Sequence, residues 1–276
     1  MAVRRIAQLS DLHLLAPRAG GSARERFASL GRALAASPRL ERARGALRRA
    51  QEASCDHVVL SGDLTELGSA AELEALAELL ADSGFRPEQI TMVPGNHDRY
   101  GEPGAWVAAF DGPLAPWKDN SPVARDPVVD LGAVRLLPID VTKPQSVMRS
   151  AGFVTDAIVD TVRAVLFDPG LASVPTVIVQ HHPPFALPPV LHRLDGLLGC
   201  ERLNELTARH EAVQVMHGHL HRHIDRGGSG SVPHVLGAPA VVGGDTRFRM
   251  YDITSDGLAP YVPTPETVPA AGMIPA

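Results

Sequence analysis

The sequence predicts a single α/β domain, and three observations support this fold class. Short apolar runs at residues 3–10, 57–61 and 90–93 alternate with helical stretches, an order typical of α/β proteins. Each of these runs is followed by polar residues of types that bind metal ions. The chain has 276 residues, 45% of them hydrophobic, which is enough to bury a sizeable core.

The composition argues against several classes of protein. A net charge of −5 gives no general electrostatic reason to bind nucleic acid or an anionic membrane. Neither a signal peptide nor a transmembrane segment is evident. The two cysteines, Cys55 and Cys200, predict neither a disulfide framework nor a cysteine zinc site. We therefore expect a reducing, cytoplasmic setting, and the sequence leaves a homo-oligomer open.

The first part of the chain predicts a strand, helix, strand, helix, strand order. The elements are a strand at 3–10, helices within 17–54, a strand at 57–61, a helix after Ser69 and a strand at 90–93. Pro38 is expected to divide 17–54 into two helices. Ser69 and Glu72 have the spacing of a capping box, and the leucine stripe that follows ends at Gly84.

Residues 17–54 are expected to form a helical insert that is basic, because arginine is concentrated there. The role of this positive charge has two interpretations. The first is two helices whose charged faces are simply solvated. The second is a basic flap that attracts an anionic substrate or lipid headgroups.

The second part of the chain predicts a further set of strands. Its elements are a long loop at 99–127, a hairpin at 128–139 that turns at Gly132, a helix capped by Thr155, a strand at 176–180, a Pro-rich loop at 183–199, a helix near 200–210, and strands at 212–223, 235–242 and 248–253. The 99–127 loop is either a wall of a substrate pocket or a surface excursion whose Trp106 and Trp117 pack on the core. The domain then covers residues 1–254, and residues 255–276 form a Pro-rich tail.

Five polar motifs each follow an apolar run. They are Asp11-Leu12-His13, Gly62-Asp63, Gly95-Asn96-His97-Asp98, His181-His182-Pro183-Pro184 and Gly218-His219-Leu220-His221. Ligands of open α/β sheets bind at the carboxyl ends of the strands. Histidines two apart on an extended segment, such as His219 and His221, would point the same way. Most of these motifs are common in turns when taken singly, but five in this order leave little room for coincidence.

The motifs supply the donor set of a dinuclear metal centre. Carboxylate oxygen, amide oxygen and imidazole nitrogen suit divalent manganese, iron or zinc. One site would use Asp11, His13, Asp63 and one histidine of the 219/221 pair; the other would use Asp63, Asn96, His181 and the remaining histidine. Two dications, two carboxylates and a bridging hydroxide leave about one net positive charge, which suits a phosphate clamped between metals about 3.5–4 Å apart.

Together the five motifs resemble those of the calcineurin-like metallophosphoesterase superfamily, over residues 9–221. The resemblance implies a four-layer α/β/β/α sandwich of two mixed sheets flanked by helices, with a dinuclear centre between the sheets.

The resemblance also implies a role for each motif residue. One metal would take Asp11, His13 and His221, the other would take Asn96, His181 and His219, and Asp63 would bridge both. His181 is preferred to His182 because it lies two places before proline, as the ligand does in similar proteins. His97 would protonate or hydrogen-bond the leaving oxygen, and Asp98 would orient it. The nucleophile would be a metal-bound hydroxide that attacks in line.

The motif Gly-Asn-His-Asp differs from the motif of the protein Ser/Thr phosphatase branch. It resembles the motif of bacterial phosphodiesterases that act on cyclic nucleotides and glycerophosphodiesters. The expected activity is therefore hydrolysis of small phosphodiesters, with a small anionic phosphate ester as substrate. An alternative is a phosphomonoesterase or a nucleotide or lipid pyrophosphatase that uses the same site. A remote alternative is a non-catalytic metal-binding scaffold, which would require degraded ligands, whereas every ligand position is filled here.

Overall fold

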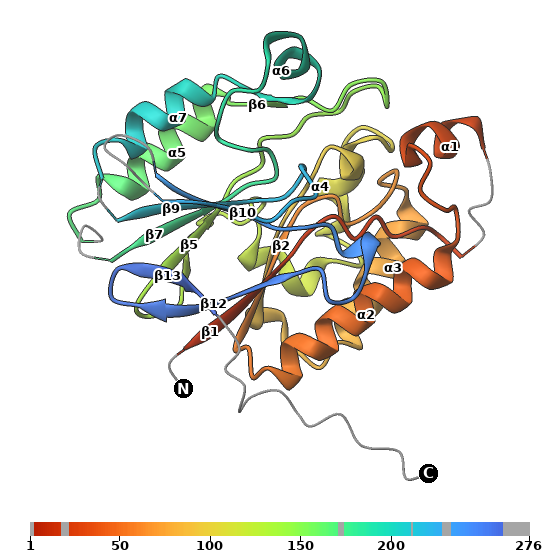
Figure 1. The fold of residues 1–276 in the computed structure, drawn as a ribbon, viewed down its shortest axis with the longest axis horizontal. Helices are drawn as coiled ribbons and strands as arrows, with labels where there is room; N and C mark the ends of the chain where they lie inside the picture. Colours follow the sequence, from red (N-terminus) through yellow and green to blue (C-terminus); the bar gives the residue numbers. More distant parts are fainter. Residues whose placement is uncertain (1–2, 18–21, 171–173, 211, 228–232, 262–276) are drawn as a thin grey trace.

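Two mixed β-sheets pack face to face, and each carries helices on its outer side (Figure 1). This arrangement comes from a computed structural model that describes residues 3–17, 22–170, 174–210, 212–227 and 233–261. The predicted four-layer α/β/β/α sandwich is confirmed.

The first sheet has the strand order β13-β12-β1-β2-β3. Its members are β1 (Arg5–Leu9), β2 (His57–Ser61), β3 (Ile90–Val93), β12 (Arg249–Thr254) and β13 (Gly257–Pro260). The first three strands are parallel, and β12 joins β1 antiparallel. The carboxyl ends of β1, β2 and β3 therefore lie at one edge, which is the edge that carries the first three polar motifs.

The second sheet has the strand order β10-β11-β9-β7-β5-β4. Its members are β4 (Val129–Asp130), β5 (Arg135–Pro138), β7 (Thr176–Val179), β9 (Val213–His217), β10 (Ile224–Arg226) and β11 (His234–Gly237). The four central strands are parallel, so β7 and β9 deliver the last two motifs to one edge. The predicted hairpin is the β4–β5 pair, and Gly132 adopts the left-handed φ of 89° between them.

Helices cover the outer face of each sheet, and short elements connect them. The α-helices are α1 (Ala23–Ser29), α2 (Ala36–Glu52), α3 (Ala70–Ala81), α4 (Ala105–Ala109), α5 (Asp156–Leu166), α6 (Pro189–Asp195) and α7 (Cys200–Thr207). The 3₁₀ turns are η1 (Pro87–Gln89), η2 (His97–Arg99), η3 (Ala115–Asn120) and η4 (Val241–Gly243), and β6 (Gly152–Phe153) pairs with β8 (Leu197–Leu198). In Figure 1, α2 and α3 lie outside the first sheet, and α5 and α7 lie outside the second.

The strands alternate their side chains between two cores. On β1, Ala7 and Leu9 pack against the helices of the first layer, whereas Ile6 packs between the sheets. The helical stripe of α3 and its capping box at Ser69 are present as predicted. Thr155 caps α5 by accepting a hydrogen bond from the backbone N–H of Ile158. The residues that form the two cores are therefore those that the strand and helix periodicities of the sequence place on one face.

Pro38 does not divide the basic insert, which corrects the expected boundary. It lies in the first turn of α2, where a missing N–H costs no helical hydrogen bond. The break falls earlier, at Leu30 and Gly31, which both adopt left-handed backbone conformations (φ 46° and 82°). Of the insert, residues 18–21 lie outside the described residues.

The 99–127 segment is not an irregular loop, because it contains α4 and η3. Trp106 and Trp117 are 1% and 4% exposed and belong to the core cluster beneath α2 and α3. These contacts support the interpretation in which both tryptophans pack on the core. The second expected loop, 183–199, likewise contains α6 and β8.

The expected domain boundary at residue 254 is too early. Residues 257–260 form β13, an edge strand that pairs with β12. Residues 262–276 of the expected tail lie outside the described residues. Cys55 and Cys200 are both buried and unpaired, and they belong to different core clusters. Among the described residues, no helix is both long and apolar enough to cross a bilayer.

Candidate metal centre

The predicted ligands converge between the two sheets, at the edge where the parallel strands end. Asp11 and His13 follow β1, Asp63 follows β2, and Asn96 follows β3. From the second sheet, His181 follows β7, and His219 and His221 follow β9. The backbone N–H of Asp11 donates to Gly62 O, and that of Gly218 donates to His181 O. These hydrogen bonds join successive motifs within each sheet.

Backbone conformation directs most of these side chains. Five of the seven predicted ligands have left-handed φ values: Asp11 (54°), His13 (48°), Asp63 (51°), His219 (65°) and His221 (53°). Such values are uncommon for residues with a side chain, and they cluster at functional sites. The extended geometry expected for His219 and His221 is therefore wrong, because β9 ends at His217. The two rings lie in different ligand groups instead of projecting in parallel.

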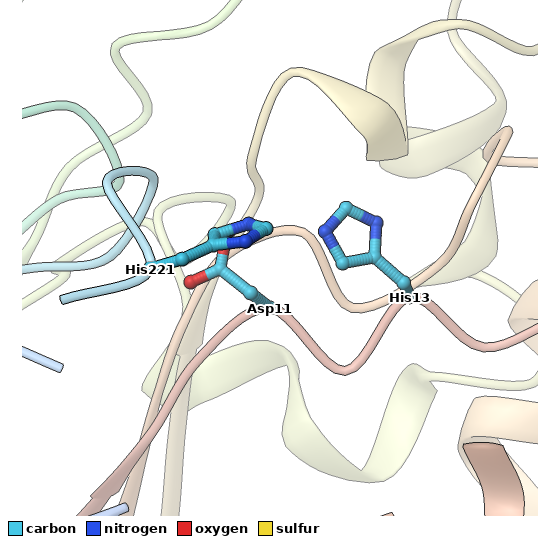
Figure 2. Close-up of side chains that lie close together, drawn as sticks. All are labelled: Asp11, His13 and His221. Atoms are coloured by element: carbon cyan, nitrogen blue, oxygen red, sulfur yellow. The ribbon is translucent and has the colours of Figure 1, made fainter. Parts of the chain in front are cut away.

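The first group consists of Asp11, His13 and His221, each with one donor atom within 4.8 Å of the others. Figure 2 shows the ring of His221 lying over the Asp11 carboxylate, with His13 beside them. His221 Nε2 is 3.2 Å from Asp11 Oδ1. Asp11 and His13 are fully buried, whereas His221 reaches the surface of the molecule. These are the three residues predicted to share one metal.

The second group consists of Asp63, His181 and His219, and a further group places His97 with His13 and Asp63. Asp63 Oδ2 is 3.3 Å from His181 Nε2 and 3.8 Å from His13 Nε2. The Asp63 carboxylate therefore lies between the two groups, as a bridging ligand must.

A chain of hydrogen bonds holds the amide group of Asn96 and fixes which of its atoms stays without a partner. Its Nδ2 donates to the Tyr100 hydroxyl (2.9 Å), which donates to Arg149 O (3.2 Å). Because Nδ2 is committed to Tyr100, the buried Oδ1 is left for another partner. Tyr100 was not predicted from the sequence, although it lies four residues after Asn96.

Partners outside the centre determine which ring nitrogen each histidine presents. His181 Nδ1 donates to Ser61 O (2.8 Å), which leaves Nε2 for the centre. His13 Nδ1 lies 3.3 Å from Glu66 Oε2, and His219 Nε2 donates to Asp195 O (2.8 Å). Such partners fix the tautomer and orientation of metal-binding histidines. Glu66 and Asp195 were also not predicted from the sequence, because their roles depend on contacts between residues far apart in the chain.

The donor atoms fit divalent cations. Within the described part of the chain, five buried donor atoms of predicted ligands have no hydrogen-bond partner: both carboxylate oxygens of Asp11, His13 Nε2, Asn96 Oδ1 and His181 Nε2. Buried polar atoms are normally hydrogen-bonded because desolvation is costly. Buried oxygen and imidazole donors that lack hydrogen-bond partners match the preferences of manganese, iron and zinc.

The electrostatics of the centre favour positive charge. Burial lowers the pKa of His181, but the Asp63 and Asp11 carboxylates outweigh it and raise the pKa to about 9. Burial would raise the pKa of Asp63, yet the neighbouring His181 and His97 hold it well below its usual value. Both shifts show that the two buried carboxylates attract cations.

Three motif glycines make room for the ligands. A Cβ at Gly62 would lie 2.4 Å from His181 Nδ1, one at Gly95 would lie 2.1 Å from Asp63 Oδ1, and one at Gly218 would lie 2.8 Å from Asp11 Oδ2. Real Cβ atoms essentially never make contacts this short. The glycines of these motifs are therefore explained by close approach to ligand side chains.

The Gly95→Ala variant should lose metal, because its new methyl group would displace the Asp63 carboxylate. We expect the metal content per chain, measured by plasma mass spectrometry after dialysis, to fall, and the free energy of unfolding to fall by about 1–3 kcal/mol. Gly227→Ala is the matched control, since no described atom lies within 4 Å of its added Cβ. An unchanged metal content in Gly95→Ala would contradict this account of the motif.

His97 faces the centre, but its ring is not oriented by Asp98. His97 Nε2 is 3.9 Å from Asp63 Oδ2, and its Nδ1 donates to Glu66 O (2.8 Å). Asp98 instead accepts hydrogen bonds from Thr65 and from the backbone N–H groups of Leu64 and Gly95. The expected orienting role is corrected: Asp98 joins the loops after β2 and β3, because its buried carboxylate is within reach of several loop donors.

The other histidines of the motifs point elsewhere. His182 Nε2 contacts Ser150 O (2.5 Å), and His217 Nδ1 donates to Gly218 O (2.8 Å). Neither they nor His223 belong to a described ligand group. The preference for His181 over His182 is therefore consistent with the geometry.

Comparisons with known proteins agree with this arrangement. A family model described as calcineurin-like phosphoesterase matches residues 4–223. A Synechococcus protein named as a probable cyclic nucleotide phosphodiesterase is 29% identical over 236 residues, which cover 85% of this chain and 79% of that protein.

Two solved structures share the fold. A dimetal phosphatase from Danio rerio aligns with a TM-score of 0.67 and 15% identity, over 91% of this chain and 93% of that one. A phosphopantetheinyl hydrolase from Mycobacterium tuberculosis aligns with a TM-score of 0.50 and 16% identity, over 98% and 99%. At these identities the structures support the fold alone.

Proposed function

Because the chain belongs to the calcineurin-like phosphoesterase family, we propose that it hydrolyses small phosphodiesters at a centre of two divalent metal ions. Family membership makes the chain a metal-dependent phosphoric ester hydrolase. The preference for diesters is supported by the Synechococcus relative, whose name is that of a phosphodiesterase. Manganese, iron and zinc are the metals that the donor set favours.

The observation that carries the proposal is the position of Asp63 between two ligand groups. Asp11, His13 and His221 would hold one ion; Asn96, His181 and His219 would hold the other; and Asp63 would contact both. When bound, the two ions would polarise the phosphoryl oxygens and activate water for in-line attack.

The His97 ring contributes proton chemistry on the same edge of the fold. Because its Nδ1 donates to Glu66 O, Nε2 would carry a proton for a substrate when the ring is in its doubly protonated imidazolium form. That atom lies near Asp63 and faces the centre. In the proposal, Nε2 gives its proton to the leaving oxygen, a general-acid role.

The test is hydrolysis of bis(4-nitrophenyl) phosphate by protein reconstituted with manganese, iron or zinc. We expect turnover that is lost on chelation and lost in Asn96→Ala, which removes a donor oxygen. Asn120→Ala is a control, since Asn120 contacts Pro87 O away from the centre. Comparison with 4-nitrophenyl phosphate measures the preference for diesters over monoesters. No turnover with any of the three metals would contradict the proposal. Faster turnover of the monoester than of the diester would show that monoesters, not diesters, are the substrate class.

A further inference from the structure

A cavity of about 470 Å³ adjoins the metal centre, between the start of α2 and the loop after β11. His221 forms part of its wall, and so do four arginines: Arg32, Arg39, Arg42 and Arg247. No acidic side chain is among the described residues that line it. We propose that this cavity binds a second phosphate group of the substrate, carried on one of the two alcohols of the phosphodiester. The inference rests on the proposed function, whose substrate class it narrows.

The arginines leave positive charge uncompensated. The buried Glu66 carboxylate lies behind the cavity, 3.0 Å from Arg32 Nη2 and in contact with Arg39 Nη1. Arg42 donates to a backbone carbonyl, Val242 O. The Arg247 guanidinium has no hydrogen-bond or ion-pair partner within the described part of the chain. Four guanidinium groups against one carboxylate leave about three positive charges, and a phosphate monoester carries about −1.5 to −2 at neutral pH.

The start of α2 adds to this positive field. The helix is 17 residues long, and its N-cap, Ala35, offers no side-chain hydrogen bond to the first N–H groups. Its first turn contains no acidic residue. Ala33, Ala35 and Pro38 line the cavity, so the positive end of the helix dipole is at its wall.

Hydrogen bonds on both sides fix the loop that closes the cavity. The backbone N–H groups of Val241 and Val242 donate to Ser10 O (3.0 Å) and Asp11 O (3.1 Å). At its other end, Asp245 accepts from Arg49 Nε of α2 (3.0 Å). The acidic side chain of this loop is thus paired away from the cavity, and the cavity is held open before a ligand arrives.

The cavity and the metal centre have His221 in common. Arg32 Nη2 is 3.4 Å from Nδ1 of the predicted ligand His13, and His221, beside Asp11, separates the two spaces. A substrate could therefore place its scissile phosphate at the centre and a second phosphate among the arginines. This arrangement gives the basic insert a specific role in recognition, which the solvated-face interpretation does not.

The test compares 4-nitrophenyl phosphodiesters whose second alcohol is butyl, 4-carboxybutyl or 4-phosphonobutyl alcohol. A second set of the same diesters has an ethyl chain in place of the butyl chain. Wild-type protein is compared with Arg42→Ala/Arg247→Ala, whose altered residues are exposed and lie outside the ligand groups. Arg48→Ala is the matched control, because Arg48 is on α2 but does not line the cavity.

We expect wild-type protein to favour the phosphono diester over the butyl diester in kcat/KM. The double variant should lose roughly tenfold to a hundredfold of this preference and keep its butyl activity, and Arg48→Ala should match wild type. A preference equal in wild type and double variant would overturn the proposal. Stronger selection for the carboxylate than for the phosphonate would overturn the assignment of phosphate.

A second measurement separates this inference from the proposed function. Calorimetric titration of metal-free protein with butylphosphonate probes the cavity without catalysis. Weaker binding by the double variant supports the cavity site even if no diester is hydrolysed, in which case only the proposed function fails. Equal or absent binding in both proteins, together with no turnover, overturns both.

Discussion

Asp63→Asn should reduce phosphodiester turnover by at least about a thousandfold, with the protein still folded. The substitution preserves the shape of the side chain and can still accept the hydrogen bond from the His97 backbone N–H (2.8 Å). It removes the negative charge that lies between the two ligand groups. Because charge stabilisation by a metal ion contributes several kcal/mol to a transition state, and each 1.4 kcal/mol is tenfold in rate, the loss should be large.

The measurement is kcat/KM for bis(4-nitrophenyl) phosphate together with the metal content of the same samples. Glu72→Gln is the control: Glu72 is also a buried carboxylate, 2% exposed, but it caps α3 outside the centre. We expect Asp63→Asn to retain fewer than two metals per chain, whereas Glu72→Gln retains the wild-type content. Near-normal turnover in Asp63→Asn would show that the carboxylate is not shared.

Replacing His97 with glutamine should slow hydrolysis in proportion to the basicity of the leaving group. A poor leaving group, such as an alkoxide, needs a proton as the bond to phosphorus breaks, and a positioned acid is worth about 10²–10⁴-fold. A 4-nitrophenolate leaves without such help. The variant should therefore lose about 10²–10⁴-fold on alkyl diesters and much less on bis(4-nitrophenyl) phosphate.

The ratio of the two losses separates proton donation from metal binding. If His97 were instead a metal ligand, as its grouping with His13 and Asp63 would permit, both substrates should lose activity equally and the metal content should fall. His57→Gln is the control, because His57 is buried and contacts Thr91 on β3 rather than the ligands. Equal losses in His97→Gln would contradict the general-acid role.

The motifs were predictable because each depends on local sequence. A buried strand that ends at a glycine and a polar residue places that residue at a sheet edge, and parallel strands share one edge. For this reason Asp63, Asn96 and His181 could be proposed as neighbours from the sequence. The capping box at Ser69 is likewise a short-range pattern.

The rest of the site depends on contacts that local patterns do not encode. Because β9 ends at His217, His219 and His221 adopt left-handed backbone conformations. Their side chains therefore do not follow the alternation of an extended strand that the sequence spacing suggested. Glu66 binds Arg39 and contacts His13, which are far from it in the sequence. Asp195 contacts His219 from α6, a helix in a Pro-rich stretch that was predicted to be a loop. These partners became visible only when the sheets were placed face to face.

Anomalous diffraction from crystals grown with manganese or zinc and a phosphate analogue tests the central claim most directly. We expect two metal peaks about 3.5–4 Å apart, each within bonding distance of an Asp63 oxygen, with the analogue across both. A single peak, or two peaks that Asp63 does not join, would contradict it.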